Sequence, residues 1–238
     1  MRRPRIALLE AANRDENNIR NFRRELDADL VEFDVANGDL PASTAGYDAI
    51  VITGSKASVY WDEPWIGPLI EFIATAFDDG LPVLGVCYGH QALAEALGGH
   101  VAGMDDFELG YNEIEVVDDD RLFAGIEDRF TVFTSHGDSV VDLPPGAELL
   151  AQNDHGIHAF RKGHAWGVQF HPEYDMETAR VIAEDKREQV GDSGVDAVLD
   201  SITPENYEAA CAAKQLFENF TQYVQEVTAE SRQAETTA

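Results

Sequence analysis

The sequence contains little sulfur and no long apolar segment. Only two cysteines and three methionines occur in 238 residues, and two cysteines cannot form the disulfide scaffold of a small secreted protein. No run of 18 apolar residues is present, which argues against a membrane-spanning helix. The basic start MRRPR lacks the hydrophobic region and cleavage site of a signal peptide. We therefore expect a soluble, cytoplasmic protein.

Positive charge is also scarce. The chain has 45 acidic side chains against 17 lysines and arginines, a formal net charge of −28, and its lysines are Lys56, Lys162, Lys186 and Lys214. The acidic residues are spread along the whole chain, and no basic stripe is present for nucleic-acid binding. A charge spread this evenly resembles the proteins of salt-accumulating archaea, in which ionic strength screens self-repulsion. That resemblance implies an origin in a halophilic archaeon.

Short apolar segments alternate with helical periods through the first hundred residues. Hydrophobic residues make up 44% of the chain, enough for one large core. The periodicity predicts strands at 6–9, 30–35, 49–53 and 82–86, and helices at 17–26, 65–77 and 91–97. This βαβ alternation indicates an α/β fold with a mostly parallel central sheet flanked by helices.

The second half of the sequence is richer in strands. We expect strands at 114–117, 130–134, 148–151, 157–160 and 165–170, followed by a helix at 176–188. Residues 191–201 are predicted to form a loop or short turn, and 204–227 a long final helix before a polar, frayed tail. We therefore predict a domain over residues 1–190 and a C-terminal helical extension over 191–238.

The segment GVCYG places Cys87 between an expected buried strand and an expected helix. Glycines two residues before and after the cysteine are typical of the nucleophile elbow, a tight turn that exposes its central side chain. The N-terminus of the following helix favours the thiolate form of that side chain. Taken alone, the pattern fits a buried core cysteine equally well.

A second motif, GVQFHPE, ends with His171 and Glu173. In an extended chain, residues i and i+2 share a face, so these two side chains can project together. This suits a general base and the carboxylate that orients it, provided that the strand ends near Cys87. Alone, the pair would indicate a surface histidine beside a proline. Together, the two motifs indicate a cysteine nucleophile with a His–Glu pair.

These motifs resemble those of the class I, or triad-type, glutamine amidotransferases, and among them the GMP-synthase-like subgroup. GVCYGHQALAEALGG is similar to the family's nucleophile motif, GVQFHPE to its His-Pro-Glu motif, and TSHGDSV to its SHxD segment. The resemblance extends from about residue 6 to residue 173. It implies Cys87 as the nucleophile, His171 as the general base and then acid, and Glu173 as the residue that orients His171.

The resemblance also implies which residues bind glutamine. Gln91, one turn into the elbow helix, would contact the backbone groups of the substrate. Asp138 would accept a hydrogen bond from the α-ammonium group, and Ser139 or His136 would help to hold the α-amino and α-carboxylate groups. Taken alone, Asp138 in the HGDS segment fits a simple turn residue.

The implied oxyanion hole uses the backbone N–H of Tyr88 and a second N–H from the turn at Gly54 and Ser55. Many family members have Gly-Gly-Pro at this turn, whereas the present chain has Gly54-Ser55-Lys56. A backbone donor does not need proline, but Ser55 lacks the access of glycine to positive φ. The choice of donor between Gly54 and Ser55 therefore stays open.

No metal or organic cofactor is expected. His136, His155 and His158 are close in sequence, but no cysteine or carboxylate spacing supports a zinc site. No P-loop signature is present either, so we do not expect an activating synthetase domain in this sequence.

The expected activity is hydrolysis of the glutamine side-chain amide through a cysteine thioester, with the ammonia supplied to an acceptor. The acceptor would be held by a separate synthetase subunit, or the enzyme would work alone. Two alternatives stay open: a stand-alone γ-glutamyl peptidase with the same triad, and a non-catalytic binding module with a vestigial site.

Overall fold

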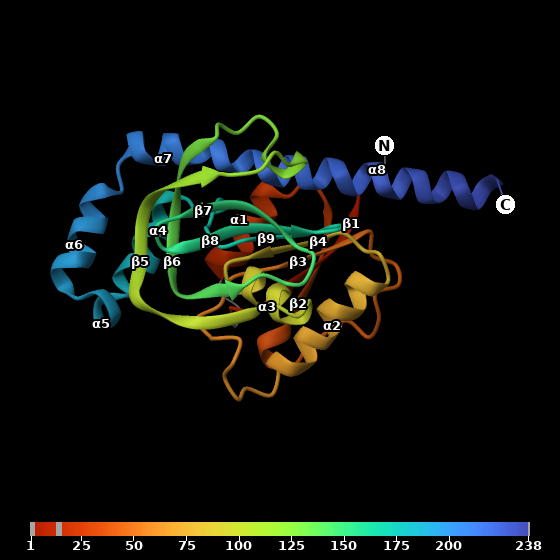
Figure 1. Cartoon of the computed structure of the whole chain (residues 1–238), viewed down its shortest axis with the longest axis horizontal. Coiled ribbons are helices and arrows are strands. Elements are labelled where there is room, and N and C mark those ends of the chain that lie inside the picture. The colour runs from red at the N-terminus through yellow and green to blue at the C-terminus, as the bar shows by residue number, and fades with distance from the viewer. Residues whose placement is uncertain (1–2, 13–15, 238) are drawn as a thin grey trace.

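The computed structural model describes residues 3–12 and 16–237 and contains one nine-stranded sheet in the order β2-β1-β3-β4-β9-β8-β7-β5-β6 (Figure 1). The strands are β1 (Arg5–Glu10), β2 (Asp29–Asp34), β3 (Ala49–Ile52), β4 (Val83–Val86), β5 (His100–Val116), β6 (Arg129–Asp142), β7 (Glu148–Asn153), β8 (Gly156–Lys162) and β9 (Ala165–Val168). The helices are α1 (Glu16–Glu25), α2 (Ile66–Asp78), α3 (Tyr88–Ala96), α4 (Met176–Glu184), α5 (Arg187–Val190), α6 (Asp192–Ser201), α7 (Pro204–Ala210) and α8 (Gln215–Thr237).

The predicted parallel sheet accounts for five of the strands. Strands β2, β1, β3, β4 and β9 pair in parallel, which confirms the α/β fold. Strands β8, β7, β5 and β6 continue the sheet with antiparallel pairs, so the whole sheet is mixed. The β5–β6 hairpin is much longer than the two short strands predicted from its apolar segments, because its pairing continues through glycines and acidic residues.

Alternate residues of the parallel strands face two hydrophobic layers. In β1, Ile6 and Leu8 belong to the core under α1 and α8, whereas Ala7 and Leu9 belong to the core under α2 and α3. All four side chains are fully buried. Burial on both faces explains why these strands are continuous apolar runs in the sequence.

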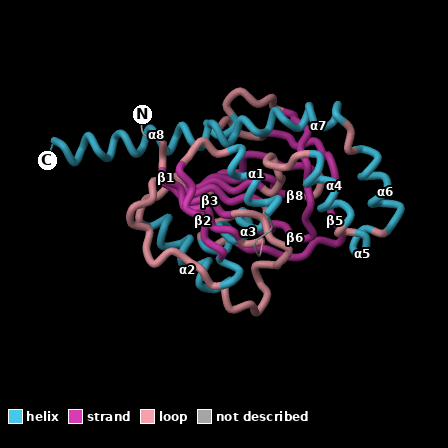
Figure 2. The backbone as a smooth tube through the Cα atoms, turned by 180° about the vertical axis from the view of Figure 1, so that it is seen from behind, coloured by secondary structure: helices cyan, strands magenta, loops and turns pink. Residues whose placement is uncertain are grey.

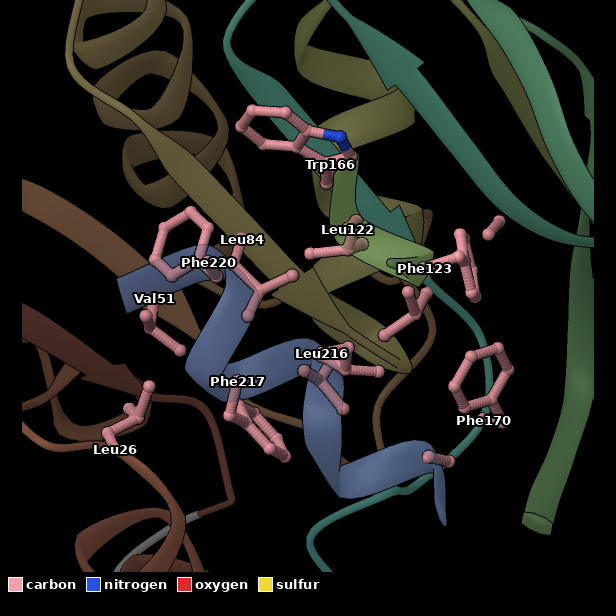
Figure 3. Packing of buried hydrophobic residues seen from close by; sticks show 14 of the residues in the cluster. Leu26, Val51, Leu84, Leu122, Phe123, Trp166, Phe170, Leu216, Phe217 and Phe220 are labelled. Carbon is pink, nitrogen blue, oxygen red and sulfur yellow. The ribbon is translucent and has the colours of Figure 1, made fainter. Parts of the chain in front are cut away.

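Helix α8 completes one of the two layers. Leu216, Phe217 and Phe220 pack against Val51 and Leu84 of the sheet (Figure 3). Farther along, α8 projects beyond the sheet as a helix to Thr237, through the residues expected to be frayed (Figure 1, Figure 2). Because α8 contributes to the core, the division at residue 190 stays a prediction. No helix within the two described ranges is long and apolar enough to cross a membrane.

The loop predicted at 191–201 is wrong, because residues Asp192–Ser201 form helix α6. Its glycine, serine and aspartates weaken the helical signal in the sequence. In the structure, Val195 is fully buried, and Val198 and Leu199 pack in a small cluster with α4. Tertiary packing of one apolar stripe therefore outweighs the local propensity.

The single final helix predicted over 204–227 is also divided. Helices α7 and α8 are separated by a 3₁₀ turn over Cys211–Lys214. Helix α7 begins with Pro204, and the Thr203 hydroxyl accepts a hydrogen bond from the N–H of Asn206 at 3.3 Å. The start of the segment was predicted correctly, and the tighter turn within it was not.

We expect salt to stabilise the folded protein. A net charge of −28 makes the compact state repel itself, and the Debye length falls from about 10 Å at 0.1 M salt to about 3 Å at 1 M. The melting temperature should therefore rise by roughly 5 °C or more between 0.1 and 2 M KCl. Circular dichroism melts would measure it, with sucrose as an uncharged control. An unchanged melting temperature would contradict the expected stabilisation by salt. It would also count against the predicted halophilic origin.

Candidate active site

The elbow predicted at Cys87 is present in the structure, but its side chain is buried rather than exposed and reaches only the wall of a cavity. Strand β4 ends at Val86 and helix α3 begins at Tyr88, with Cys87 between them at φ 54° and ψ −105°. Among the described residues, Cys87 is the only non-glycine residue with positive φ. Such a conformation costs on the order of 1–3 kcal/mol and persists only where the surrounding structure enforces it. It places the sulfur at the N-terminus of α3, beyond the carboxyl end of β4.

Two glycines allow α3 to pack directly on the sheet. A Cβ atom at residue 85 would lie 2.2 Å from the carbonyl oxygen of Gly89. A Cβ atom at residue 89 would lie 2.4 Å from the carbonyl oxygen of Ile52. Neither approach is sterically allowed, so both glycines are required. Their close contacts fix the position of Cys87 relative to β3 and β4.

His171 is held by a backbone hydrogen bond and by the side chains of Glu173 and Tyr174. Its N–H donates to the carbonyl of Phe133 at 2.8 Å, which ties the residue to β6. Its Nδ1 lies 2.8 Å from Oε1 of Glu173, and its ring stacks on Tyr174 with centroids 4.1 Å apart. His171 and Glu173 are both buried. The shared face predicted for these two residues is therefore present.

The charges around His171 favour its protonated form. Burial lowers the pKa of His171, but the negative charges of Cys87 and Glu173 outweigh burial and raise this pKa to about 10. An imidazolium beside the sulfur in turn stabilises a thiolate. His171 is therefore protonated beside the sulfur at neutral pH, and this positive charge is lost only as the pH rises toward 10.

The turn after β3 lies against both reacting groups. A Cβ atom at residue 54 would lie 3.0 Å from Cε1 of His171 and 3.6 Å from Cβ of Cys87. The backbone of this turn is therefore close enough to serve as the second oxyanion donor beside Tyr88. The hydroxyl of Ser55 accepts the N–H of Ala57 at 3.1 Å, which shapes the turn. The choice between Gly54 and Ser55 as the donor stays a prediction.

Replacing Gly54 with alanine should lower kcat for glutamine about 10- to 100-fold. The added methyl group would lie 3.0 Å from Cε1 of His171 and would displace the imidazole, and a misplacement of about 1 Å can reduce a rate about 10²-fold. Steady-state ammonia release would measure the effect. Gly67→Ala is the matched control, since a Cβ atom there meets nothing within 4 Å. Equal losses in the two variants would contradict the prediction.

A cavity of about 220 Å³ opens beside Cys87, and it is lined by Gln91 and Asp138, the two residues expected to contact the substrate. One carboxylate oxygen of Asp138 accepts a hydrogen bond from the Ser58 hydroxyl, and the other accepts from the Tyr60 hydroxyl at 2.7 Å. Gln91 donates to the backbone carbonyl of Asp138 at 3.1 Å. The Asp138 carboxylate is therefore fixed in position before any substrate arrives.

His136 and Ser139 lie less favourably for the substrate contacts predicted for them. Nδ1 of His136 is 2.9 Å from the carbonyl oxygen of Asp138, and Nε2 is 2.5 Å from Oε2 of Glu108. Both ring nitrogens therefore already have polar partners within the protein. Ser139 lines a different cavity, together with Met104. His136 itself lines the cavity beside Cys87, and a direct contact of either residue with the substrate stays a prediction.

The buried carboxylate of Glu108 contacts two histidines, His136 and His158. This link was not predicted from the sequence. Oε2 of Glu108 also lies 3.2 Å from Nε2 of His158, and its Oε1 accepts a hydrogen bond from Asn153 at 2.7 Å. Burial raises the pKa of Glu108, but the two histidines outweigh burial and lower it. Atoms of Glu108, His136 and His158 lie within 4.8 Å of one another, close enough for metal ligands, whereas His155 is exposed.

The sequence matches the family model of class I glutamine amidotransferases over residues 13–186, which is well over half of the chain. The chain belongs to this family. The prediction of family and enzyme class is thereby confirmed.

Curated relatives of this amidotransferase are named as glutamine-hydrolysing GMP synthases. The protein from Thermomicrobium roseum is 45% identical over 125 residues, which cover 52% of this chain and 23% of the relative. The protein from Vibrio vulnificus is 34% identical over 174 residues, which cover 71% of this chain and 32% of the relative. The chain thus spans about a third or less of the length of these two relatives.

Solved structures of amidotransferases share the fold. One from Thermotoga maritima has a TM-score of 0.79 at 24% identity and covers 93% of this chain and 99% of its own. A candidate GMP synthase subunit from Thermoplasma acidophilum has a TM-score of 0.70 at 18% identity and covers 98% and 99%. At these identities the likeness concerns the fold alone.

Sequence reasoning missed two residues of the amidotransferase site. Tyr174 stacks on His171, and its position directly after the HPE motif was the available signal. Lys186 lines the same cavity as Cys87 and Asp138. It lies between α4 and α5, in a segment predicted as one plain helix, so only its scarcity as a lysine could have drawn attention to it.

Proposed function

We propose that this amidotransferase hydrolyses the side-chain amide of glutamine through a thioester on Cys87 and supplies the ammonia to a separate acceptor subunit. The observation that carries the proposal is the strained Cys87, which has His171 beside it and the Gly54 turn against both. Residues 1–190 would carry the chemistry, and residues 191–238 would complete the core through α8.

The thiolate of Cys87 attacks the carboxamide carbon, and the resulting oxyanion accepts hydrogen bonds from the N–H of Tyr88 and from the Gly54–Ser55 turn. His171 gives its proton to the leaving nitrogen, which departs as ammonia. Water then transfers a proton to His171 and attacks the thioester, which releases glutamate and restores the thiolate. Glu173 holds Nδ1 of His171 throughout, so the other ring nitrogen faces the reaction.

The names of the relatives support a GMP-synthase-like use of the ammonia. One solved structure that shares the fold is named as a candidate subunit of GMP synthase, and the relatives above share about a third or less of their length with this chain. We infer that a second polypeptide provides the activated acceptor. Tyr60 and Trp61 are 55% and 50% exposed beside the cavity, so they would belong to the contact surface.

The activity test compares ammonia release from glutamine with cleavage of γ-glutamyl peptides by the purified chain. Selective ammonia release supports the proposal. Rapid γ-glutamyl cleavage would select the stand-alone peptidase instead, and inertness toward both substrates, with and without an acceptor subunit, would select a vestigial module.

We expect the free chain to be a weak glutaminase whose rate rises at least tenfold with its acceptor subunit. Closure of a second protein over the mouth would order the Gly54–Ser55 turn, and tenfold corresponds to about 1.4 kcal/mol in the barrier. Coupled assays with the synthetase subunit of a GMP synthase would measure the rate, and Trp61→Ala should reduce the stimulation more than the basal rate. Equal rates with and without that subunit would contradict this acceptor.

A further inference from the structure

Two of the four lysines in this strongly acidic chain line the cavity beside Cys87. Lys56 is exposed, and its Nζ lies 2.6 Å from Oδ2 of Asp185, so its charge is already paired. Lys186 is half-buried, and among the described residues no carboxylate pairs with it. An unpaired ammonium group is unusual where acidic residues outnumber basic ones by 45 to 17.

The surroundings hold Lys186 at the cavity wall. Its Nζ lies 5.2 Å from the centre of the Phe107 ring, close enough for a cation–π contact. That ring is itself packed on Gly137, where a Cβ atom would come within 2.9 Å of it. Burial lowers the pKa of Lys186, which shows that its ammonium group has lost part of its hydration. A bound anion would restore that lost interaction.

The cavity therefore presents one fixed anion and one unpaired cation, together with the nucleophile. Asp138 has both oxygens held by Ser58 and Tyr60 and can accept from an α-ammonium group. A free α-amino acid also carries an α-carboxylate, and both ring nitrogens of His136 already have partners. Lys186 is then the cationic partner left for the carboxylate.

We propose that Lys186 binds the α-carboxylate of the substrate and restricts the site to γ-amides of free glutamate. This inference rests on the proposed function, because it assumes that Cys87 attacks a γ-carboxamide carbon. It excludes glutamine within a peptide chain, whose α-carboxylate is consumed in an amide bond. It also predicts that an ω-amide without the carboxylate binds poorly.

The experiment tests whether the effect of replacing Lys186 depends on the α-carboxylate of the substrate. Wild type, Lys186→Met and Lys162→Met are assayed for ammonia release from glutamine and from 4-aminobutanamide, which is glutamine without its α-carboxylate. Lys162 is the control, since its Nζ donates to the carbonyl of Leu97 away from this cavity. Lys186→Met should lose about 10- to 100-fold in kcat/KM on glutamine, mostly through KM, and less than about threefold on the truncated amide. Lys186→Arg should restore most of the loss.

A second measurement needs no turnover. Protection of Cys87 from iodoacetamide is compared for glutamate and 4-aminobutanoate, and only protection by glutamate should weaken in Lys186→Met. Equal losses on the carboxylated and truncated compounds would overturn the proposal. They would mean that Lys186 stabilises the Cys87 thiolate or the folded protein instead. No loss on glutamine would overturn it as well. A wild type that releases no ammonia from glutamine, with or without an acceptor subunit, would instead refute the proposed function, while the protection assay would still decide the role of Lys186.

Discussion

Replacing Cys87 with alanine or serine should abolish ammonia release from glutamine, with a loss of at least about 10⁴-fold, as is seen when the nucleophile of a catalytic triad is removed. No thioester can form without the sulfur, and a serine hydroxyl does not ionise beside His171 as a thiol does. Neither replacement adds volume at the elbow, so the circular dichroism spectrum should not change. Cys211→Ala is the matched control, because Cys211 lies in the 3₁₀ turn between α7 and α8.

Alkylation gives an independent measure of the same nucleophile. A glutamine-like electrophile should label Cys87 and spare Cys211, as peptide mass mapping would show. The labelling should persist at neutral pH, because the imidazolium of His171 is lost only as the pH rises toward 10. Equal labelling of the two cysteines at pH 7 would contradict the assignment of Cys87.

The parallel half of the sheet was predictable because its signal is local. Strands such as Ala49–Ile52 are short, apolar and buried on both faces, and amphipathic helices separate them in the sequence. The β5–β6 hairpin and α6 were not predictable in this way. The hairpin depends on pairing between residues far apart in the sequence, and α6 depends on the burial of Val195 and on the packing of Val198 and Leu199 against other elements.

The proposed triad was predictable for a related reason. The glycines around Cys87 and the spacing of His171 and Glu173 are local constraints that the backbone imposes. The walls of the cavity are assembled from separate segments instead. Lys186 approaches from the α4–α5 connection, and Glu108 meets His136 only because β5 and β6 pair. Sequence spacing carries no direct information on such contacts.

Loss of His171 should be about as damaging as loss of the thiol, whereas Glu173→Gln should cost about 10²- to 10⁴-fold in kcat. His171 serves both in forming the thiolate and in protonating the leaving nitrogen, so alanine removes both steps. A glutamine at 173 can still accept the hydrogen bond from Nδ1, now 2.8 Å from Glu173, but it carries no charge to stabilise the imidazolium. Glu177→Gln is the matched control, since that side chain is 70% exposed.

The pH dependence of the variants distinguishes the electrostatic role of Glu173, which is to stabilise the His171 imidazolium, from a purely structural role. The negative charge of Glu173 helps to raise the pKa of His171, so its removal lowers that pKa and the imidazolium is lost at a lower pH. The alkaline limb of ammonia release, which needs the imidazolium to protonate the leaving nitrogen, should therefore move to lower pH in Glu173→Gln and stay in place in Glu177→Gln. An unchanged rate and an unchanged limb in Glu173→Gln, with His171→Ala inactive, would reduce the triad to a Cys87–His171 dyad.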